Sequence, residues 1–230
     1  MKTHLLIPTM FLAACATTGT GAGGGSKSSA PFQGLEAVNK RRAEITDASK
    51  TVMDCLKSKA SDPPMKGGIF AVTADATGKM TVTPVRWEGP ADKKQCVVDT
   101  AGKTTLTPLP GPAVGALWEF MAPGEKIVDA TVPKDLEEKL ASLQMAAGAE
   151  VEACAQQNLP PDFPADTEVA FFVDREGQVY VPTVVKSTAK DGGYDTCVQG
   201  VVSKQKFPAI NVPKPVGLTF RFHTGRLEKL

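Results

Sequence analysis

Histidine is nearly absent from this chain. Its 230 residues include two histidines, His4 and His223, against 26 basic and 25 acidic side chains. One histidine beyond the extreme N-terminus argues against imidazole acid–base chemistry and against a zinc centre. The net charge of +1 argues against nucleic acid as a partner. The sequence also lacks P-loop, G-x-S-x-G and H-E-x-x-H patterns, so we expect no catalytic residues, no metal and no cofactor.

No apolar run near the N-terminus is long enough to span a bilayer, which requires about 20 residues. The run from Leu5 to Ala14 follows Lys2 and ends in small residues before Cys15. A basic start, a short apolar stretch and small residues at a cut site are typical of a secretory signal. We therefore predict a signal peptide over residues 1–14.

The tetrapeptide Leu12-Ala13-Ala14-Cys15 resembles the lipobox of bacterial lipoproteins. The resemblance implies cleavage before Cys15, a lipid thioether on its sulfur and an acylated N-terminus. Residue 16 is Ala rather than Asp, which by the sorting rule of enteric bacteria implies the outer membrane, facing the periplasm or the cell surface. Residues 15–32 are rich in Gly, Ser and Thr, which is typical of a flexible tether. The alternative is an ordinary secreted protein with a cysteine at this position.

The rest of the chain contains an internal repeat. Cysteines, turn glycines and closing aromatic strands recur in the same order, and the spacing between the first matched cysteines equals that between the turn glycines. We predict two units, over residues 33–124 and 133–225. The matched pairs are Cys55 and Cys154, Gly78 and Gly177, and Cys96 and Cys197.

Each unit has the pattern helix, strand, strand, helix, strand. Apolar residues recur at helical spacing before the first cysteine of each unit. Two strands then follow around a glycine-containing turn. Leu218, Phe220 and Phe222 alternate with polar residues, as in a half-buried strand. The predicted fold class is α+β, with two tandem units that each place helices on one face of a small antiparallel sheet.

Four cysteines follow Cys15. In an exported protein a disulfide framework is expected, and four cysteines allow three pairings. The repeat favours one pair within each unit, Cys55–Cys96 and Cys154–Cys197. A four-thiolate zinc site is the alternative, although the close C-x2–4-C pairs typical of zinc are absent from the sequence.

Each second strand carries a proline, Pro84 or Pro182. Proline cannot donate a hydrogen bond to a ladder, so it favours an edge strand. The first strand is then central and the last strand forms the other edge, which predicts the order 2-1-3 in each unit. Segments 116–121 and 218–223 would then carry unpaired backbone groups unless something covers them.

Several segments of the second unit support a family resemblance. They are the helix with Cys154, the hairpin around Gly177, Cys197-Val198, Lys206-Phe207-Pro208 and the closing Leu218-Thr219-Phe220-Arg221-Phe222. Together they resemble the TonB C-terminal-like domain, and more closely the cysteine-containing version at the C-terminus of AgmX/PglI-type proteins of myxobacteria. The first unit matches less well, with Thr107-Pro108 in the place of Phe207-Pro208.

The resemblance implies a non-enzymatic module that binds an envelope protein or peptide as an added strand. The implied binding edge is Leu218, Thr219, Phe220, Arg221 and Phe222. TonB's N-terminal transmembrane helix and Pro-rich spacer have no counterpart here, so only the binding mode is carried over. The membrane would be contacted through the lipid anchor alone. The alternatives are an envelope enzyme or peptidoglycan-associated accessory protein, with Asp174, Glu176 and Asp191 as candidate carboxylates, and a passive structural lipoprotein.

Overall fold

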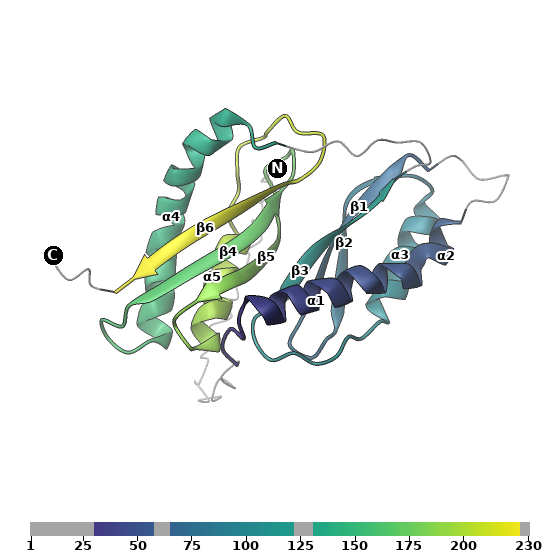
Figure 1. Cartoon of the computed structure of the whole chain (residues 1–230). Coiled ribbons are helices and arrows are strands. Elements are labelled where there is room, and N and C mark those ends of the chain that lie inside the picture. The colour runs from purple at the N-terminus through teal and green to yellow at the C-terminus, as the bar shows by residue number, and fades with distance from the viewer. Residues whose placement is uncertain (1–29, 58–64, 122–130, 226–230) are drawn as a thin grey trace, which may run out of the picture.

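The computed structural model describes residues 30–57, 65–121 and 131–225. The predicted signal peptide, Cys15 and the tether before residue 30 lie outside these ranges. The described residues form two units with the same order of strands and long helices (Figure 1). Within them, no helix is both long and apolar enough to cross a membrane.

The first unit contains a three-stranded antiparallel sheet in the order β2-β1-β3. Its predicted first helix is interrupted by a 3-10 turn. In chain order its elements are α1 (Leu35–Ala48), the 3-10 turn (Ser49–Val52), α2 (Met53–Leu56), β1 (Gly67–Ala74), β2 (Met80–Glu88), α3 (Ala91–Gly102) and β3 (Val114–Met121).

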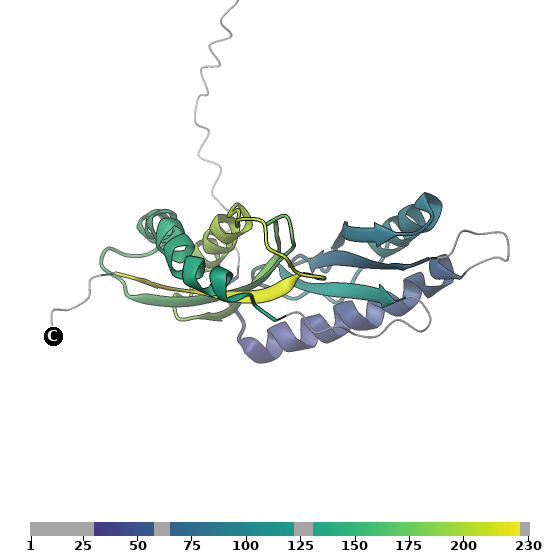
Figure 2. The ribbon, with the colours of Figure 1, turned by 90° about the horizontal axis from the view of Figure 1, so that it is seen from above.

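The second unit repeats this sheet in the order β5-β4-β6. Figure 2 shows its two helices on the same side of the strands. The predicted fold class and the predicted strand order are therefore confirmed. In chain order its elements are α4 (Lys134–Asn158), β4 (Ala165–Val173), β5 (Val179–Ser187), α5 (Gly192–Ser203) and β6 (Val216–Thr224).

The hairpin turns of the two units are built alike. Gly78 and Gly177 have φ angles of 84° and 81°, the left-handed region that glycine adopts without strain. Each glycine carbonyl accepts a hydrogen bond of 2.9 Å, from the amide of Leu106 in the first unit and of Phe207 in the second. The counterpart of Phe207 is therefore Leu106, and the sequence match to Thr107 was wrong by one residue.

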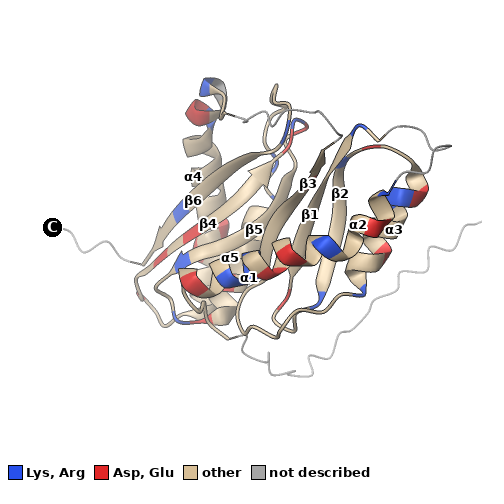
Figure 3. Ribbon diagram, turned by 45° about the vertical axis from the view of Figure 1, so that its right-hand side comes forward, with Lys and Arg blue, Asp and Glu red and all other residues tan. Residues whose placement is uncertain are grey.

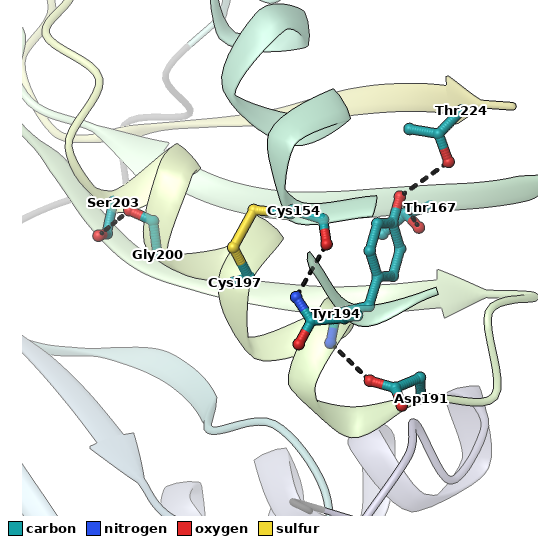
Figure 4. The surroundings of a disulfide bond; sticks show 9 residues. Cys154, Thr167, Asp191, Tyr194, Cys197, Gly200, Ser203 and Thr224 are labelled. Carbon is teal, nitrogen blue, oxygen red and sulfur yellow. Dashed lines mark hydrogen bonds between the residues drawn. A yellow bond between two sulfur atoms is a disulfide. The ribbon is translucent and has the colours of Figure 1, made fainter. Parts of the chain in front are cut away.

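Each unit encloses its own apolar core between sheet and helices. Both predicted disulfides are present: Cys55–Cys96 joins α2 to α3, and Cys154–Cys197 joins α4 to α5. Beside the second disulfide, the ring of Tyr194 is buried between the helices and the sheet (Figure 4). Disulfide and core thus hold the helices of each unit on the same face of its sheet.

The two sheets lie side by side, with β3 next to β5 (Figure 3). We call this contact the junction. The N–H of Gly115 donates to Thr183 Oγ1 at 2.9 Å, and a Cβ on Gly115 would overlap the Cβ of Val181. Val181 has a φ of 45°, which is rare for a β-branched residue. The junction is thus a close contact without a backbone ladder between β3 and β5.

Side chains connect the two units around the junction. Gln199 of α5 donates its amide to the carbonyl of Ala113, at 2.6 Å, and to that of Pro182. Arg86 of β2 donates to the carbonyl of Pro213, at 2.6 Å. These bonds, together with the close packing of Val181 against Gly115, hold the two units against each other.

Adding a methyl group at Gly115 should therefore destabilise the protein. We expect Gly115→Ala to lower the free energy of unfolding by about 1–3 kcal/mol, because the new Cβ forces Val181 out of its place. The control is Gly217→Ala, whose Cβ would make only ordinary contact with Phe172 and should raise stability by up to about 1 kcal/mol, because glycine inside a strand is less favourable than alanine. Urea denaturation measures both, and equal effects would contradict the close approach at the junction.

Candidate partner-binding edge

In the described part of the chain, four strands lie at the edge of a sheet: β2, β3, β5 and β6. Because β3 and β5 face each other, β2 and β6 are the outer strands, and the order across both sheets is β6-β4-β5-β3-β1-β2. The predicted edge at 116–121 therefore faces the second unit, which the sequence did not indicate. The predicted edge at 218–223, in β6, lies on the outside.

The two outer strands differ in regularity. β2 contains Pro84, as predicted for an edge strand, and its register with β1 shifts between Ile69 and Phe70. β6 pairs with β4 over nine successive residue pairs without a shift. Prolines and bulges protect a sheet edge from pairing with a further strand. β6 is therefore the outer strand better suited to accept one.

The side chains of β6 alternate between the core and solvent, as the sequence predicted. Phe220 is fully buried, with its ring 4.9 Å from that of Phe171. This packing fixes the strand while its outer backbone groups face away from β4. The core-facing residues of the predicted edge are Leu218, Phe220 and Phe222, and the exposed ones are Thr219 and Arg221.

One hydrogen bond fixes the direction of the edge amides. The N–H of Arg221 donates to Oε1 of Gln144 in α4, at 3.2 Å, and so points away from β4. The N–H groups of successive residues point to opposite sides of an antiparallel strand, so the amides of residues 217 and 219 point outward like that of Arg221. Gln144 acts here as a side-chain substitute for a partner carbonyl. A strand that added to β6 at this point would replace it.

The sheet face away from the helices carries a row of charges across the strands. Glu168 of β4 lies between Lys186 of β5, at 3.5 Å, and Arg221 of β6, at 3.7 Å. At the end of the strands, Asp166 contacts His223 at 2.7 Å. Arg221 is 76 % exposed, so these pairs contribute little to stability. The exposed Arg221 gives the β6 edge a cationic side chain that a partner carboxylate could approach.

A second row on this face is aromatic. Tyr180 pairs with Phe172, which pairs with Gly217 at the outer edge. Burial, with the nearby carboxylates of Asp174 and Glu176, raises the pKa of Tyr180 to about 12. The Tyr180 hydroxyl therefore stays protonated at physiological pH, and the row remains uncharged.

The three candidate carboxylates do not converge. Asp174 Oδ1 accepts the amides of Glu176 and Gln178, which forms the hairpin turn. Asp191 Oδ1 accepts the N–H of Tyr194 at 2.8 Å and caps α5 (Figure 4). These are turn and cap contacts at opposite ends of β5. Among the described residues, no group of three or more His, Cys, Asp or Glu side chains could hold a metal ion.

A buried carboxyl lies where the end of the predicted tether meets the folded body. Asp195 of α5 is fully buried, and its Oδ2 accepts the N–H of Phe32 at 3.0 Å. In the described structure its Oδ1 has no hydrogen-bond partner. Burial raises the pKa of Asp195 and nearby Asp191 adds to this, while Phe32 N–H and Ser187 oppose it. The Phe32 side chain packs against both cores, so this segment is anchored between the two units.

The raised pKa of Asp195 predicts a pH dependence of stability. The folded state holds the Asp195 proton more tightly than the unfolded state, whose pKa is about 3.9. The stabilisation that this tighter proton binding gives to the folded state is complete below the unfolded pKa of Asp195, and it is lost as pH rises through the folded pKa. We expect Asp195→Asn, which cannot ionise, to become more stable relative to wild type as pH rises in this window. Urea denaturation between pH 4 and 7 measures this, and parallel profiles would contradict it.

Comparison of the chain with protein-family models, with curated proteins and with solved structures finds no match. The likeness to TonB C-terminal-like domains therefore stays a prediction from the residues.

The sequence did not predict the junction, the Gln144 contact or the Asp195 contact. The one available signal was Gly115, which occupies the same place in its strand as Gly217 in the second unit. A glycine inside a strand often marks the close approach of another backbone.

Proposed function

We propose that this chain is a lipid-anchored protein of the cell envelope that binds a partner protein by adding a strand of the partner to β6. The observation that carries the binding mode is the regular outer strand β6, whose Arg221 amide is directed away from the sheet. In strand addition, main-chain hydrogen bonds supply affinity and alternate side-chain positions supply specificity. The TonB resemblance implies the same mode.

The anchor part of the proposal rests on Leu12-Ala13-Ala14-Cys15 and on the Gly- and Ser-rich residues that follow. Acylation of Cys15 would place the body on the outer membrane, facing the periplasm or the cell surface. Chain after residue 15 would then reach the body at Phe32, which contacts both units. Two units packed together would present β6 to a partner at the end of this tether.

Proline substitution tests strand addition directly. Arg221→Pro removes the outward N–H, whereas Arg221→Ala removes the side chain and keeps the N–H. We expect Arg221→Pro to reduce capture of envelope partners by about tenfold or more, and Arg221→Ala to reduce it much less. Gln144→Ala should maintain or increase capture, because it removes the group that occupies the amide. Circular dichroism verifies folding of each variant.

Thr219→Pro provides a second proline variant on the same side of the strand, with Thr219→Ala as its control. Undiminished capture by both folded proline variants would exclude strand addition at β6. Equal losses in Arg221→Ala and Arg221→Pro would assign binding to the side chain rather than to the backbone.

A further inference from the structure

The junction provides a precedent for what the β6 edge can bind, because β3 and β6 are equivalent strands of the repeat. Gly115 is the second residue of β3 and pairs with Thr73, one residue before the end of β1. Gly217 is the second residue of β6 and pairs with Phe172, one residue before the end of β4. The two glycines therefore occupy the same position at the same edge.

In the first unit the structure explains why position 115 is a glycine. A Cβ on Gly115 would overlap Val181 of β5 and approach its Cγ1 to 2.9 Å. The Gly115 N–H donates to Thr183 Oγ1 at 2.9 Å. The segment Val181-Pro182-Thr183 thus binds the edge with an aliphatic side chain over the glycine and a hydroxyl on its amide. The proline between them donates no hydrogen bond, and no ladder forms.

In the second unit, the residues that the structure describes do not explain why position 217 is a glycine. Gly217 is exposed, its φ lies outside the left-handed region, and a Cβ would lie 3.6 Å from the Phe172 ring, which is ordinary contact. Glycine inside a strand lowers stability relative to alanine. It also commonly marks a place where another backbone approaches closely. The contact at Gly115 therefore favours an external segment that packs on Gly217. The lack of a local explanation for this glycine favours the same conclusion.

The surroundings of Gly217 suit the same kind of segment. Its amide points outward, on the same side as that of Arg221. On the sheet face beside it lies the partly exposed ring of Phe172, where the first unit has Thr73. A β-branched side chain seated over Gly217 would pack against this ring. Apolar contact with the ring and a hydroxyl on the amide would thus both favour such a segment.

We propose that Gly217 is the binding position for the partner strand, and that it binds a strand segment of the type Val-Pro-Thr from another protein, with the bulge that Val181-Pro182-Thr183 has at Gly115. The inference rests on the proposed strand addition at β6 and adds the partner's chemistry. The aliphatic residue lies over Gly217, and the hydroxyl two residues later accepts its N–H. A side chain at position 217 would exclude this segment.

A peptide copied from the junction tests the proposed binding at Gly217. The probe is a fluorescent nonapeptide with the sequence of residues 178–186, and its anisotropy is measured with the full-length chain in detergent micelles. We expect saturable binding that Gly217→Val weakens by about tenfold or more, since the valine would overlap the bound segment. Gly217→Ala is a smaller second variant, and Gly102→Val, in open space on α3, should bind as wild type does. Replacing the peptide threonine by valine should also weaken binding.

The outcomes separate binding at Gly217 from strand addition itself. No binding to the wild type, or binding as tight as that of the wild type by both folded Gly217→Val and folded Gly217→Ala, would overturn the proposed binding at Gly217. Loss in Arg221→Pro together with full binding by the Gly217 variants would keep strand addition and overturn only the binding at Gly217. Full peptide binding by Arg221→Pro, together with loss of peptide binding in Gly217→Val, would support binding at Gly217 and contradict strand addition along β6. Self-association of the chain that Gly217→Val abolishes would replace the foreign partner with a second copy.

Discussion

Loss of the Cys154–Cys197 disulfide should lower the free energy of unfolding by about 4 kcal/mol. The bond closes a loop with a sequence separation of 43 residues, and the entropy that it removes from the unfolded chain grows with loop length. It joins α4 to α5 over a sheet of only three strands. A small unit of this kind buries too little apolar surface to make such a contribution dispensable.

Chemical denaturation of Cys154→Ala/Cys197→Ala measures this effect. Reduced wild-type protein separates the loss of the covalent link from the loss of sulfur packing, because reduction retains both sulfur atoms. The matched control is Cys55→Ala/Cys96→Ala, which opens a loop of separation 41 in the first unit and should show a similar loss. A change below about 1 kcal/mol for both pairs would contradict the view that the disulfides support thin cores.

Replacement of Cys15 by alanine should block processing and abolish the lipid anchor. The variant should keep residues 1–14 and gain no acyl mass, because the lipobox resemblance places cleavage immediately before a lipid-modified cysteine. Two acyl chains already anchor a protein stably, and each buried CH2 contributes about 0.8 kcal/mol. Mass spectrometry of the N-terminal peptide and membrane fractionation test this.

The cysteine pair variants of the two units provide the control for the Cys15 experiment. They should remain acylated, because their substitutions leave Leu12-Ala13-Ala14-Cys15 unchanged. A wild-type chain that carries no acyl group at its N-terminus would contradict the anchor and would leave an ordinary exported protein.

Local and repeated features could be predicted from the sequence. The spacing of the cysteines gave the correct pairs, since a repeat favours links within each unit. Pro84 and Pro182 gave the correct edge strands, because proline has no N–H for a ladder. The alternation from Leu218 to Phe222 gave the correct buried face. Each of these features depends on one residue type with a fixed physical consequence.

Contacts between the units could not be predicted in this way. The left-handed φ of Val181 is unusual for valine, so no propensity indicates it. Gln199 and Gln144 are polar helix residues whose acceptor and donor lie in other elements. Burial of Asp195 depends on where Phe32 packs. Placement of the two sheets therefore had to come from the structure, and with it the finding that the edge at 116–121 faces the second unit.

The most direct test of the account is a photocrosslinking scan in intact cells. A photoreactive amino acid replaces Thr219 on β6, Thr83 on β2 or Leu117 on β3, one at a time, in the full-length chain. We expect adducts with a partner protein from position 219 and none from positions 83 and 117. Adducts from position 83 or 117 with none from 219 would contradict β6 as the binding edge.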